Sequence, residues 1–390
     1  MPKILRIINR FNLGGPTYNA AYLTKNLSPE FETMLVGGVK SDTEDSSEFI
    51  VHDLGIEPVI IPEMKRAINP KNDWIAYKKI QKIIKNFQPD IVHTHASKAG
   101  ALGRLAASKQ KVPVIIHTFH GNVFHSYFNP LKTSLYKNIE QYLAKKSTRI
   151  IAISEKQKEE LSIIHKICHS DKITVIPLGF DLLRFQENME EKRRAFRKKF
   201  NIDDDEIAIG IVGRIVPVKN HGLFIEALSH VKARTSCKIR AFIVGDGEDR
   251  QKIEYAAKKL NIDKATLTFT SWIKDIDHVY AGMDIIALTS LNEGTPVSLI
   301  EAQAANKPIV STKAGGVENV VIPKITALLS ENNDTLAFSG NLLSLIEKPK
   351  MRYDMGKEGW NHVKEKFHYT RLVNDMRKLY KKLLTLRNFK

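Results

Sequence analysis

Cysteine is scarce in this chain, with only Cys168 and Cys237 among 390 residues. The two lie far apart in the sequence and outside any metal-like spacing, so they argue against a disulfide framework and suit a reducing compartment. No apolar run approaches the ~20 residues that a membrane-spanning helix needs. The opening MPKILRIINRF has basic residues among its apolar ones and no small-residue cleavage site. We therefore expect a first strand rather than an export signal, in a cytoplasmic protein.

Acidic residues are outnumbered by basic ones, 43 to 60, which gives a formal net charge of +17. Residues 1–200 carry +12 of this excess. The balance favours an anionic partner without identifying it. A nucleic-acid-binding protein is one interpretation, but the charge is dispersed and no nucleic-acid reader motif is present, so no nucleic acid is expected. The first half is the better candidate for the face toward an anionic surface.

The length exceeds what one hydrophobic core usually supports, so two domains are expected. Short β-branched runs alternate with helical stretches, which predicts parallel sheets covered by helices on both faces. A basic, polar stretch at 187–199, after Pro177 and Gly179, reads as the region between the domains. Strands are predicted at 3–9, 32–38, 58–63, 90–95, 112–118, 149–154 and 172–177, and then at 207–214, 239–247, 265–271, 284–290 and 308–313.

A weak internal repeat supports two similar domains. KILRIINRFNLGG and the helix after it parallel IAIGIVGRIVPVK and its helix, and GRLAASKQKVPVIIHTFHG parallels IEAQAANKPIVSTKAGG. Each half thus repeats a strand, a loop and a helix, with the loops at the carboxyl ends of the strands. In open parallel sheets that edge is where ligands bind.

The strongest motif is EGTPVSLIEA at 293–302. Gly294 makes a tight turn, and Pro296 suits a first helical position because its missing N–H would be orphaned there anyway. The amides near Val297 and Ser298 are then free to bind an anion at the helix start. Glu293 and Glu301 flank this site, where carboxylates accept hydrogen bonds from sugar hydroxyls. A helix cap and a solvated side chain are the alternative roles for the two glutamates.

Two further motifs follow first strands. GRIVPVKN at 213–220 supplies Arg214 and Lys219, two cations that suit a leaving diphosphate, although surface charges are the alternative. FNLGGPTYNAA at 11–21 supplies Gly14 and Gly15, which allow the backbone to approach a phosphate or sugar closely. The GDGEDR turn at 245–250 is too weak to indicate a dinucleotide or ATP site.

Together, in this order, these motifs resemble glycosyltransferase family 4. The resemblance implies the GT-B fold, an α/β architecture of two Rossmann-like domains whose parallel sheets face each other across a cleft. It places an acceptor-binding domain at 1–185, joined by the C-terminal helix at about 372–390, and a nucleotide-sugar domain at 200–371. It implies a retaining, metal-independent transfer of a hexose-type sugar from a nucleoside diphosphate sugar, with UDP preferred, to a hydroxyl of a lipid-linked or polysaccharide precursor.

The resemblance also implies residue roles. Glu301 would hold the donor ribose, Glu293 and the 294–297 backbone the transferred sugar, and Arg214 and Lys219 the diphosphate. His120 would lie near the reacting carbon, with a structural role at the strand end as the alternative. Trp272 is a candidate for the nucleobase, with a core or rim aromatic as the alternative. The donor set is Gly14, Gly15, Arg214, Lys219, Glu293, Gly294, Thr295, Pro296, Val297, Ser298 and Glu301, and the acceptor candidates are Tyr18, His95, Lys98 and Asn122.

Five histidines, at 93, 95, 117, 120 and 125, gather in the first half. Few carboxylates and no cysteine lie near enough to complete a tetrahedral zinc set, so no metal is expected there, and the histidines are interpreted as lining the acceptor cleft. The resemblance likewise implies no cofactor, since the nucleotide sugar is a substrate. His93 and His95 should share one face of a strand.

The stretch 71–87 places Trp74, Tyr77, Ile80, Ile84 and Phe87 on one helical stripe, with lysines largely elsewhere. We expect a helix covering the first sheet, and peripheral contact with an anionic membrane is the alternative. A sugar-nucleotide epimerase remains the alternative enzyme, because it shares the fold.

Overall fold

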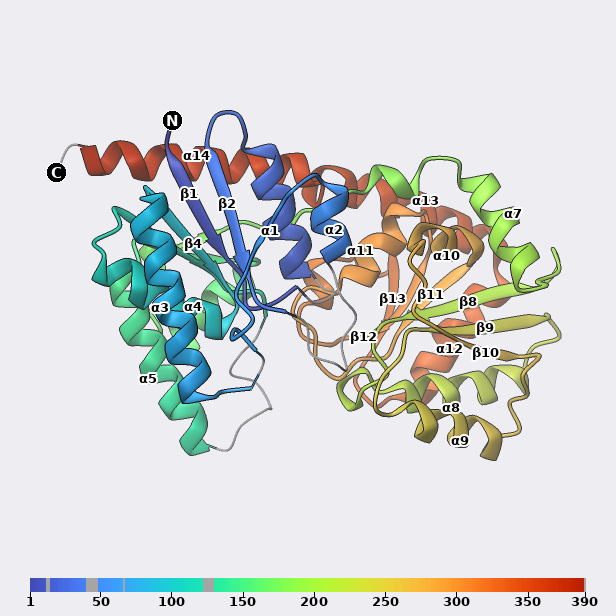
Figure 1. Ribbon diagram of the computed structural model, residues 1–390. Helices are drawn as coiled ribbons and strands as arrows, with labels where there is room; N and C mark the ends of the chain where they lie inside the picture. Colours follow the sequence, from blue (N-terminus) through green and yellow to red (C-terminus); the bar gives the residue numbers. More distant parts are fainter. Residues whose placement is uncertain (12–14, 40–47, 66, 122–129, 389–390) are drawn as a thin grey trace. The chain divides into compact units, whose positions relative to one another are not determined.

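The computed structural model describes residues 1–11, 15–39, 48–65, 67–121 and 130–388. Its contacts divide the chain into two compact units, one of residues 1–180 with 367–390 and one of residues 181–366 (Figure 1). Each unit is a parallel β-sheet flanked by helices, as the alternating pattern predicts. The predicted α/β class is confirmed.

The first unit holds a seven-stranded sheet in the order β3-β2-β1-β4-β5-β6-β7. Its strands are β1 (Lys3–Ile7), β2 (Glu32–Gly37), β3 (Val59–Ile60), β4 (Ile91–His95), β5 (Val114–Thr118), β6 (Arg149–Ala152) and β7 (Ile173–Val175). Its helices are α1 (Gly15–Asn26), α2 (Glu48–Asp53), α3 (Pro70–Phe87), α4 (Ser97–Lys109), α5 (Pro130–Lys146), α6 (Glu155–Glu159), the π-helical turn η1 (Glu160–Ile164) and the terminal α14 (Tyr369–Asn388).

The second unit holds a six-stranded sheet in the order β10-β9-β8-β11-β12-β13. Its strands are β8 (Ile207–Val212), β9 (Ile239–Val244), β10 (Leu267–Ser271), β11 (Ile285–Leu288), β12 (Ile309–Thr312) and β13 (Ala327–Ser330). Its helices are α7 (Met189–Lys199), α8 (His221–Lys232), α9 (Arg250–Lys259), α10 (Ile276–Gly282), α11 (Val297–Ala304), α12 (Thr335–Glu347) and α13 (Pro349–Lys366).

The two sheets share one topology. Both begin on a central strand, run two strands to one side and then continue on the other side of the first strand. β1 therefore corresponds to β8, and β5 to β12, which is the pairing that the two repeated segments predict. Each of the predicted strand segments contains a strand, and β13 is the strand that the pattern missed. The basic stretch at 187–199 forms α7, which packs on α10 within the second unit.

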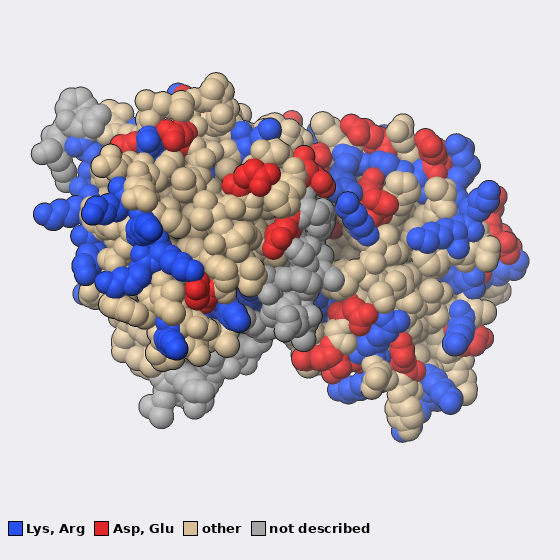
Figure 2. All heavy atoms as spheres, viewed as in Figure 1, with Lys and Arg blue, Asp and Glu red and all other residues tan. Residues whose placement is uncertain are grey.

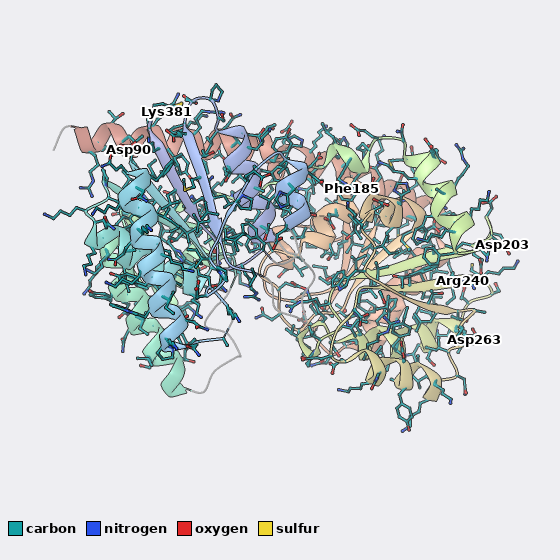
Figure 3. All side chains as sticks on the ribbon, in the orientation of Figure 1. Asp90, Phe185, Asp203, Arg240, Asp263 and Lys381 are labelled. Atoms are coloured by element: carbon teal, nitrogen blue, oxygen red, sulfur yellow. The ribbon has the colours of Figure 1, made fainter. Side chains whose placement is uncertain are left out.

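The helix α14 packs on the first unit. Leu372, Met376 and Leu383 lie in one core with Leu23 of α1, Leu27 and apolar residues of the sheet. Arg377 and Lys381 form ion pairs with Glu30, and Lys381 is labelled in Figure 3. Among the described helices, none combines the length and apolar composition needed to cross a bilayer.

Candidate active site

The strand order of the second sheet reverses between β8 and β11. Loops that leave the carboxyl ends of two such strands border the crevice where open parallel sheets bind ligands. The loop after β8 carries Arg214 and Lys219, and the loop after β11 carries Glu293. The amide of Leu291 donates a hydrogen bond to the carbonyl of Val218, at 2.8 Å, and joins the two loops.

Lys219 and Glu293 meet at this edge. The Lys219 ammonium lies 2.5 Å from Oε1 of Glu293, and the Ser290 hydroxyl donates to the same oxygen at 2.6 Å. The Thr289 hydroxyl donates a hydrogen bond to the backbone carbonyl of Lys219 at 3.0 Å. Only 22% of the Lys219 side chain and 10% of the Glu293 side chain are exposed. The pair is therefore fixed in place, with the lysine charge balanced by the carboxylate.

Arg214 differs from Lys219 in its surroundings. Its side chain is exposed and has no ion-pair or hydrogen-bond partner among the described residues. A guanidinium at the carboxyl edge of β8 without a carboxylate keeps its full charge for an anionic ligand.

The loop after β12 locks the turn of Glu293 and Gly294. The amide of Gly316 donates to the Glu293 carbonyl at 2.8 Å. A Cβ on Gly316 would stand 1.7 Å from the Gly294 carbonyl oxygen, and Gly315 has a left-handed φ of +53°. Only glycines allow this approach of two backbones. The glutamate motif is thus held from the side by a second loop.

The helix α11 begins one residue later than the sequence suggested. Pro296 has φ −71° and ψ 95°, so it is the N-cap rather than the first helical residue. The ring of Pro296 fixes its φ, but its ψ is extended rather than helical, so the first residue with a helical backbone is Val297. The first amides to bond back are those of Leu299 and Ile300, which donate to the Pro296 carbonyl. Within the described residues the amides of Val297 and Ser298 have no acceptor, as an anion site requires.

Glu301 lies on α11 beside the buried Tyr280 of α10. Burial raises the pKa of the Glu301 carboxyl to about 7, against the opposing effects of a hydrogen bond from Tyr280 and the positive charge of Arg184. The Tyr280 hydroxyl also lies 3.0 Å from the Ser298 carbonyl. Burial and the neighbouring Glu301 raise the pKa of Tyr280. At neutral pH the Glu301 carboxyl is divided between its two protonation states.

A second set of charged residues, which the sequence interpretation missed, surrounds Glu301 and Tyr280. Asp277 of α10 bonds Arg184 at 2.8 Å and Lys192 at 2.9 Å. These cations hold the pKa of Asp277 at about 2, although its burial opposes the shift. The ring of Phe185, which is labelled in Figure 3, packs edge-on against Tyr280, with centroids 5.6 Å apart. No motif indicated these residues, because Arg184 and Asp277 are 93 positions apart.

Trp272 follows β10 at the same edge of the second sheet and is 38% exposed. It passes close to Gly245, where a Cβ would lie 3.5 Å from the Trp272 ring and 2.0 Å from the Gly213 carbonyl. The GDGEDR turn therefore has a packing role, because Gly245 allows the loops after β8 and β9 to contact each other. This contact places Trp272 near the GRIVPVKN motif.

In the first unit His95 and His120 form a pair. His95 Nδ1 lies 2.8 Å from His120 Nε2, and neither of their remaining ring nitrogens has a partner among the described residues. Burial lowers the pKa of His120 to about 3 and, with the nearby charges, moves that of His95 well below its usual range. Both rings are neutral at physiological pH, so one proton is shared across the contact.

The interpretation of all the histidines as lining a cleft is wrong for His93 and His117. His93 is buried between the Tyr380 hydroxyl at 2.6 Å and the Thr118 hydroxyl at 2.7 Å, and His117 contacts Thr94 at 2.9 Å. They serve the core polar network. His93 and His95 do share a strand face, with ring centroids 4.2 Å apart. Within the described residues no group of three or more metal-ligating side chains is placed to hold an ion.

Lys98 has a structural role. Its ammonium pairs with Asp73 of α3 at 2.5 Å and donates to the carbonyls of Lys65 and Ala67. It therefore ties α4 to α3 and the preceding loop. Tyr18 stacks on Tyr22 in α1, with centroids 6.2 Å apart, and Gly15 begins that helix. The candidates Gly14 and Asn122, and with them His125, lie outside the described residues.

Two family models together cover most of the chain. Residues 14–184 match the family described as Glycosyltransferase Family 4, and residues 192–362 match the one described as Glycosyl transferases group 1. The UDP-Gal:alpha-D-GlcNAc-diphosphoundecaprenol alpha-1,3-galactosyltransferase of Escherichia coli is 31% identical over 329 residues, 84% of each chain. The chain belongs to glycosyltransferase family 4. It is a glycosyltransferase, and the resemblance drawn from its motifs is confirmed.

Other similar proteins share less of their sequence with this chain. The capsular polysaccharide biosynthesis glycosyltransferase CapM of Staphylococcus aureus is 25% identical over 88% of this chain and 89% of its own. Among solved structures, a glycosyltransferase from Rickettsia africae ESF-5 has a TM-score of 0.81 at 22% identity, covering 98% of both chains. Anabaena Alr3699/HepE in complex with UDP has a TM-score of 0.82 at 17% identity over 97% of this chain and 100% of that one. These matches place both parallel-sheet units in the GT-B fold.

Proposed function

We propose that this family 4 glycosyltransferase moves a hexose-type unit from a UDP-sugar to a hydroxyl of a lipid-diphosphate-linked sugar, with retention of anomeric configuration. The observation that carries the proposal is the convergence of the exposed Arg214, the Lys219–Glu293 pair and the open amides of Val297 and Ser298 on adjoining loops of one sheet edge. The relative from Escherichia coli uses UDP-Gal and a diphosphoundecaprenol-linked acceptor, by its name, and Alr3699/HepE binds UDP.

The donor is assigned to the second unit. The α11 amides and Arg214 bind the diphosphate, and Lys219 approaches it with its position fixed by Glu293. Glu301 accepts hydrogen bonds from the ribose hydroxyls, and Trp272 borders the nucleobase at the mouth of the site. The Glu293 backbone and the residues Gly294, Thr295 and Pro296 contact the transferred sugar.

The chemistry follows from charge. As the bond from the anomeric carbon to the diphosphate oxygen breaks, negative charge grows on the leaving group, where Arg214 and Lys219 stabilise it. The acceptor oxygen attacks the anomeric carbon from the face that the diphosphate leaves, and the proton of the acceptor hydroxyl passes to the departing diphosphate. We assign His120, in the first unit, to the neighbourhood of the reacting carbon, because the neutral ring that burial enforces can donate or accept a hydrogen bond without adding charge.

The test has two parts. Calorimetry with UDP, UDP-glucose, UDP-galactose and a GDP-sugar should show binding of the UDP ligands, and Glu301→Ala should remove it. Transfer is then measured on a short-chain prenyl-diphosphate-linked sugar, with the anomeric configuration of the product determined by NMR. A new sugar nucleotide formed without any acceptor would favour an epimerase, and unchanged binding by Glu301→Ala would remove that residue from the donor site.

A further inference from the structure

The rings of His95 and His120 meet at the carboxyl edge of the first sheet. His95 is the last residue of β4, and His120 follows β5, the strand paired with it. His95 Nδ1 lies 2.8 Å from His120 Nε2, and the ring centroids are 5.1 Å apart. The other nitrogen of each ring, Nε2 of His95 and Nδ1 of His120, has no hydrogen-bond partner among the described residues. The pair therefore has one internal hydrogen bond and two open nitrogens.

Both rings are neutral because their surroundings resist a positive charge. Burial, the neighbouring histidines and Arg6 move the pKa of His95 well below its usual range, and burial lowers that of His120 to about 3. Figure 2 shows lysines and arginines spread over the surface, but Arg6 is completely buried, on β1 in register with His93. Its charge therefore acts on the face of the sheet that carries His93 and His95. A single proton then lies between His95 and His120.

His93 holds the His95 ring in place. Both ring nitrogens of His93 are engaged, one by the Tyr380 hydroxyl at 2.6 Å and one by the Thr118 hydroxyl at 2.7 Å. The His93 ring packs against that of His95, with centroids 4.2 Å apart. His95 is thus fixed to the polar core on one side and contacts His120 on the other. Because His95 is completely buried, it acts on a ligand only through His120.

The contact between the two rings allows two arrangements of their protons. In the first, His95 donates its Nδ1–H to Nε2 of His120, which leaves a bare Nε2 on His95 and an N–H at Nδ1 of His120. In the second, His120 donates its Nε2–H to Nδ1 of His95, which leaves an N–H at Nε2 of His95 and a bare Nδ1 on His120. The open nitrogen of His120 is therefore a hydrogen-bond donor in the first arrangement and an acceptor in the second.

Burial favours the first arrangement. In the second, the open N–H belongs to His95, which is completely buried and has no acceptor for Nε2 among the described residues. Among buried backbone groups, N–H groups without an acceptor are rarer than acceptors without a donor, and the same preference applies to ring nitrogens. In the first, the open N–H belongs to His120, which is only partly buried and follows β5 at the edge where parallel sheets bind ligands.

We propose that His95 is a positioning residue for His120. It donates its Nδ1–H to Nε2 of His120, fixes the orientation of that ring, and leaves His120 as a hydrogen-bond donor only, through Nδ1–H, to an oxygen of the transferred sugar. The inference rests on the proposed function, which assigns His120 to the neighbourhood of the reacting carbon. With its Nε2 lone pair engaged, His120 has no free lone pair to accept the proton of the acceptor hydroxyl, which leaves the departing diphosphate as the base.

The first test is NMR of the full chain with ¹⁵N-labelled histidine and no substrate, because ring ¹⁵N shifts distinguish the two neutral tautomers. Both His95 and His120 should carry their proton on Nδ1, with their signals assigned by loss in His95→Leu and His120→Gln. In His95→Leu the His120 ring should become a mixture of tautomers, because its donor is gone. His95→Asn should keep the Nδ1–H form of His120, because the asparagine amide can donate from nearly the same place. A proton on Nε2 of either ring in the unchanged chain would overturn the proposal.

Kinetics then separates positioning from a purely structural role. His95→Leu should lower kcat about 10–100-fold, the range for removal of a group that orients a metal-bound histidine, and should leave UDP binding by the second unit nearly unchanged. His95→Asn should recover most of the lost turnover. The matched control is His117→Leu, which removes a buried histidine that contacts Thr94 on the opposite face of the sheet. This control should lower the Tm but keep kcat within about threefold, since it has no contact with His120.

Equal losses of turnover in His95→Leu and His95→Asn would overturn the positioning role, because a structural defect would not depend on the donor. Equal losses in His95→Leu and His117→Leu, or full turnover in His95→Leu, would overturn it as well. The tautomers are measured without substrate. Absence of any sugar transfer by the unchanged chain would therefore count against the proposed function, and the NMR result alone would decide on the histidine pair.

Discussion

At the residue scale, the protonation of Glu301 controls what the donor site can offer. An ionised carboxylate accepts hydrogen bonds from two sugar hydroxyls, whereas the protonated acid loses part of that capacity. Because burial raises the pKa of Glu301 to about 7, the acceptor form is lost as the pH falls through neutrality. The Tyr280 hydroxyl opposes this shift by donating to the carboxylate.

We predict that affinity for UDP-glucose falls as the pH drops from about 8 to about 6, with a midpoint near the Glu301 pKa of about 7. Tyr280→Phe should move the midpoint to higher pH, because it removes a hydrogen bond that stabilises the charged form. Calorimetry across this range measures both effects, and Glu301→Gln should give a flat, weak profile. A midpoint that stays in place in Tyr280→Phe would contradict the role given to the hydroxyl.

Arg214 tests the leaving-group assignment. We predict that Arg214→Ala lowers kcat by roughly 10²–10³, the range for removal of one pre-aimed charge-stabilising group, and weakens UDP-glucose binding less. Steady-state kinetics and calorimetry separate the two effects. Arg234→Ala, an exposed cation at the other end of α8, is the control and should keep full activity. Equal turnover in both variants would refute the assignment.

At the element scale, the site depends on loops that support each other. Glu293 and Gly294 are held by the Lys219 loop on one side and by Gly315 and Gly316 on the other. The backbones of Gly315 and Gly316 lie so close to those of Glu293 and Gly294 that no side chain fits between them. A backbone carbonyl group cannot move away from an added Cβ as easily as a flexible side chain can. The geometry of the donor site is therefore as sensitive to these glycines as to its charged residues.

Gly316→Ala should destabilise the protein by about 1–3 kcal/mol and weaken UDP-glucose binding, because its Cβ would overlap the Gly294 carbonyl. Gly340→Ala on α12 is the matched control, since nothing lies within 4 Å of its Cβ. It should stabilise by up to about 1 kcal/mol through helix propensity. Thermal denaturation of both variants, with and without UDP-glucose, is the measurement, and a higher Tm for Gly316→Ala would contradict the packing argument.

At the scale of the whole molecule, polar groups inside the first unit join the last helix to the first strand. The buried Arg6 of β1 donates to Thr24 at 2.7 Å and to the Tyr380 hydroxyl of α14 at 3.2 Å, and Tyr380 contacts His93. Burial and the positive charge of Arg6 hold the pKa of His93 well below its usual range. Residues from opposite ends of the chain thus complete one network.

This network predicts acid sensitivity. Folded-state pKa values below 6.5 mean that the unfolded chain binds more protons below pH 6.5, so stability is full above that pH and decreases as the pH falls. Each such histidine contributes up to about 1.4 kcal/mol per pH unit, and Glu301 opposes them with one proton. Denaturant unfolding from pH 7 to pH 5 should show the loss, with His169→Gln, an exposed site, as the control. Constant stability would contradict it. The contributing residues are His93, His95, His117 and His120 of the first unit, and His221 of the second unit adds to the same effect.

The sequence alone determined the two α/β units, nearly all the strands, and the motifs of Arg214, Lys219 and the two glutamates. Periodicity and turn chemistry are local, and the carboxyl edge of a parallel sheet collects loops wherever the strands lie. The pattern missed β13 because its sequence, ALLS, contains no β-branched or aromatic residue.

Only the tertiary structure decided which side chains meet. Tyr280 lies beside Glu301, a contact that no sequence pattern indicated. Lys98 forms an ion pair with Asp73, although it was an acceptor candidate, and Trp74 is exposed, although its spacing placed it with the buried residues of its helix. Contacts between residues far apart in the chain depend on how helices pack and where charges find partners. That packing is set by the fold as a whole, and no single segment encodes it.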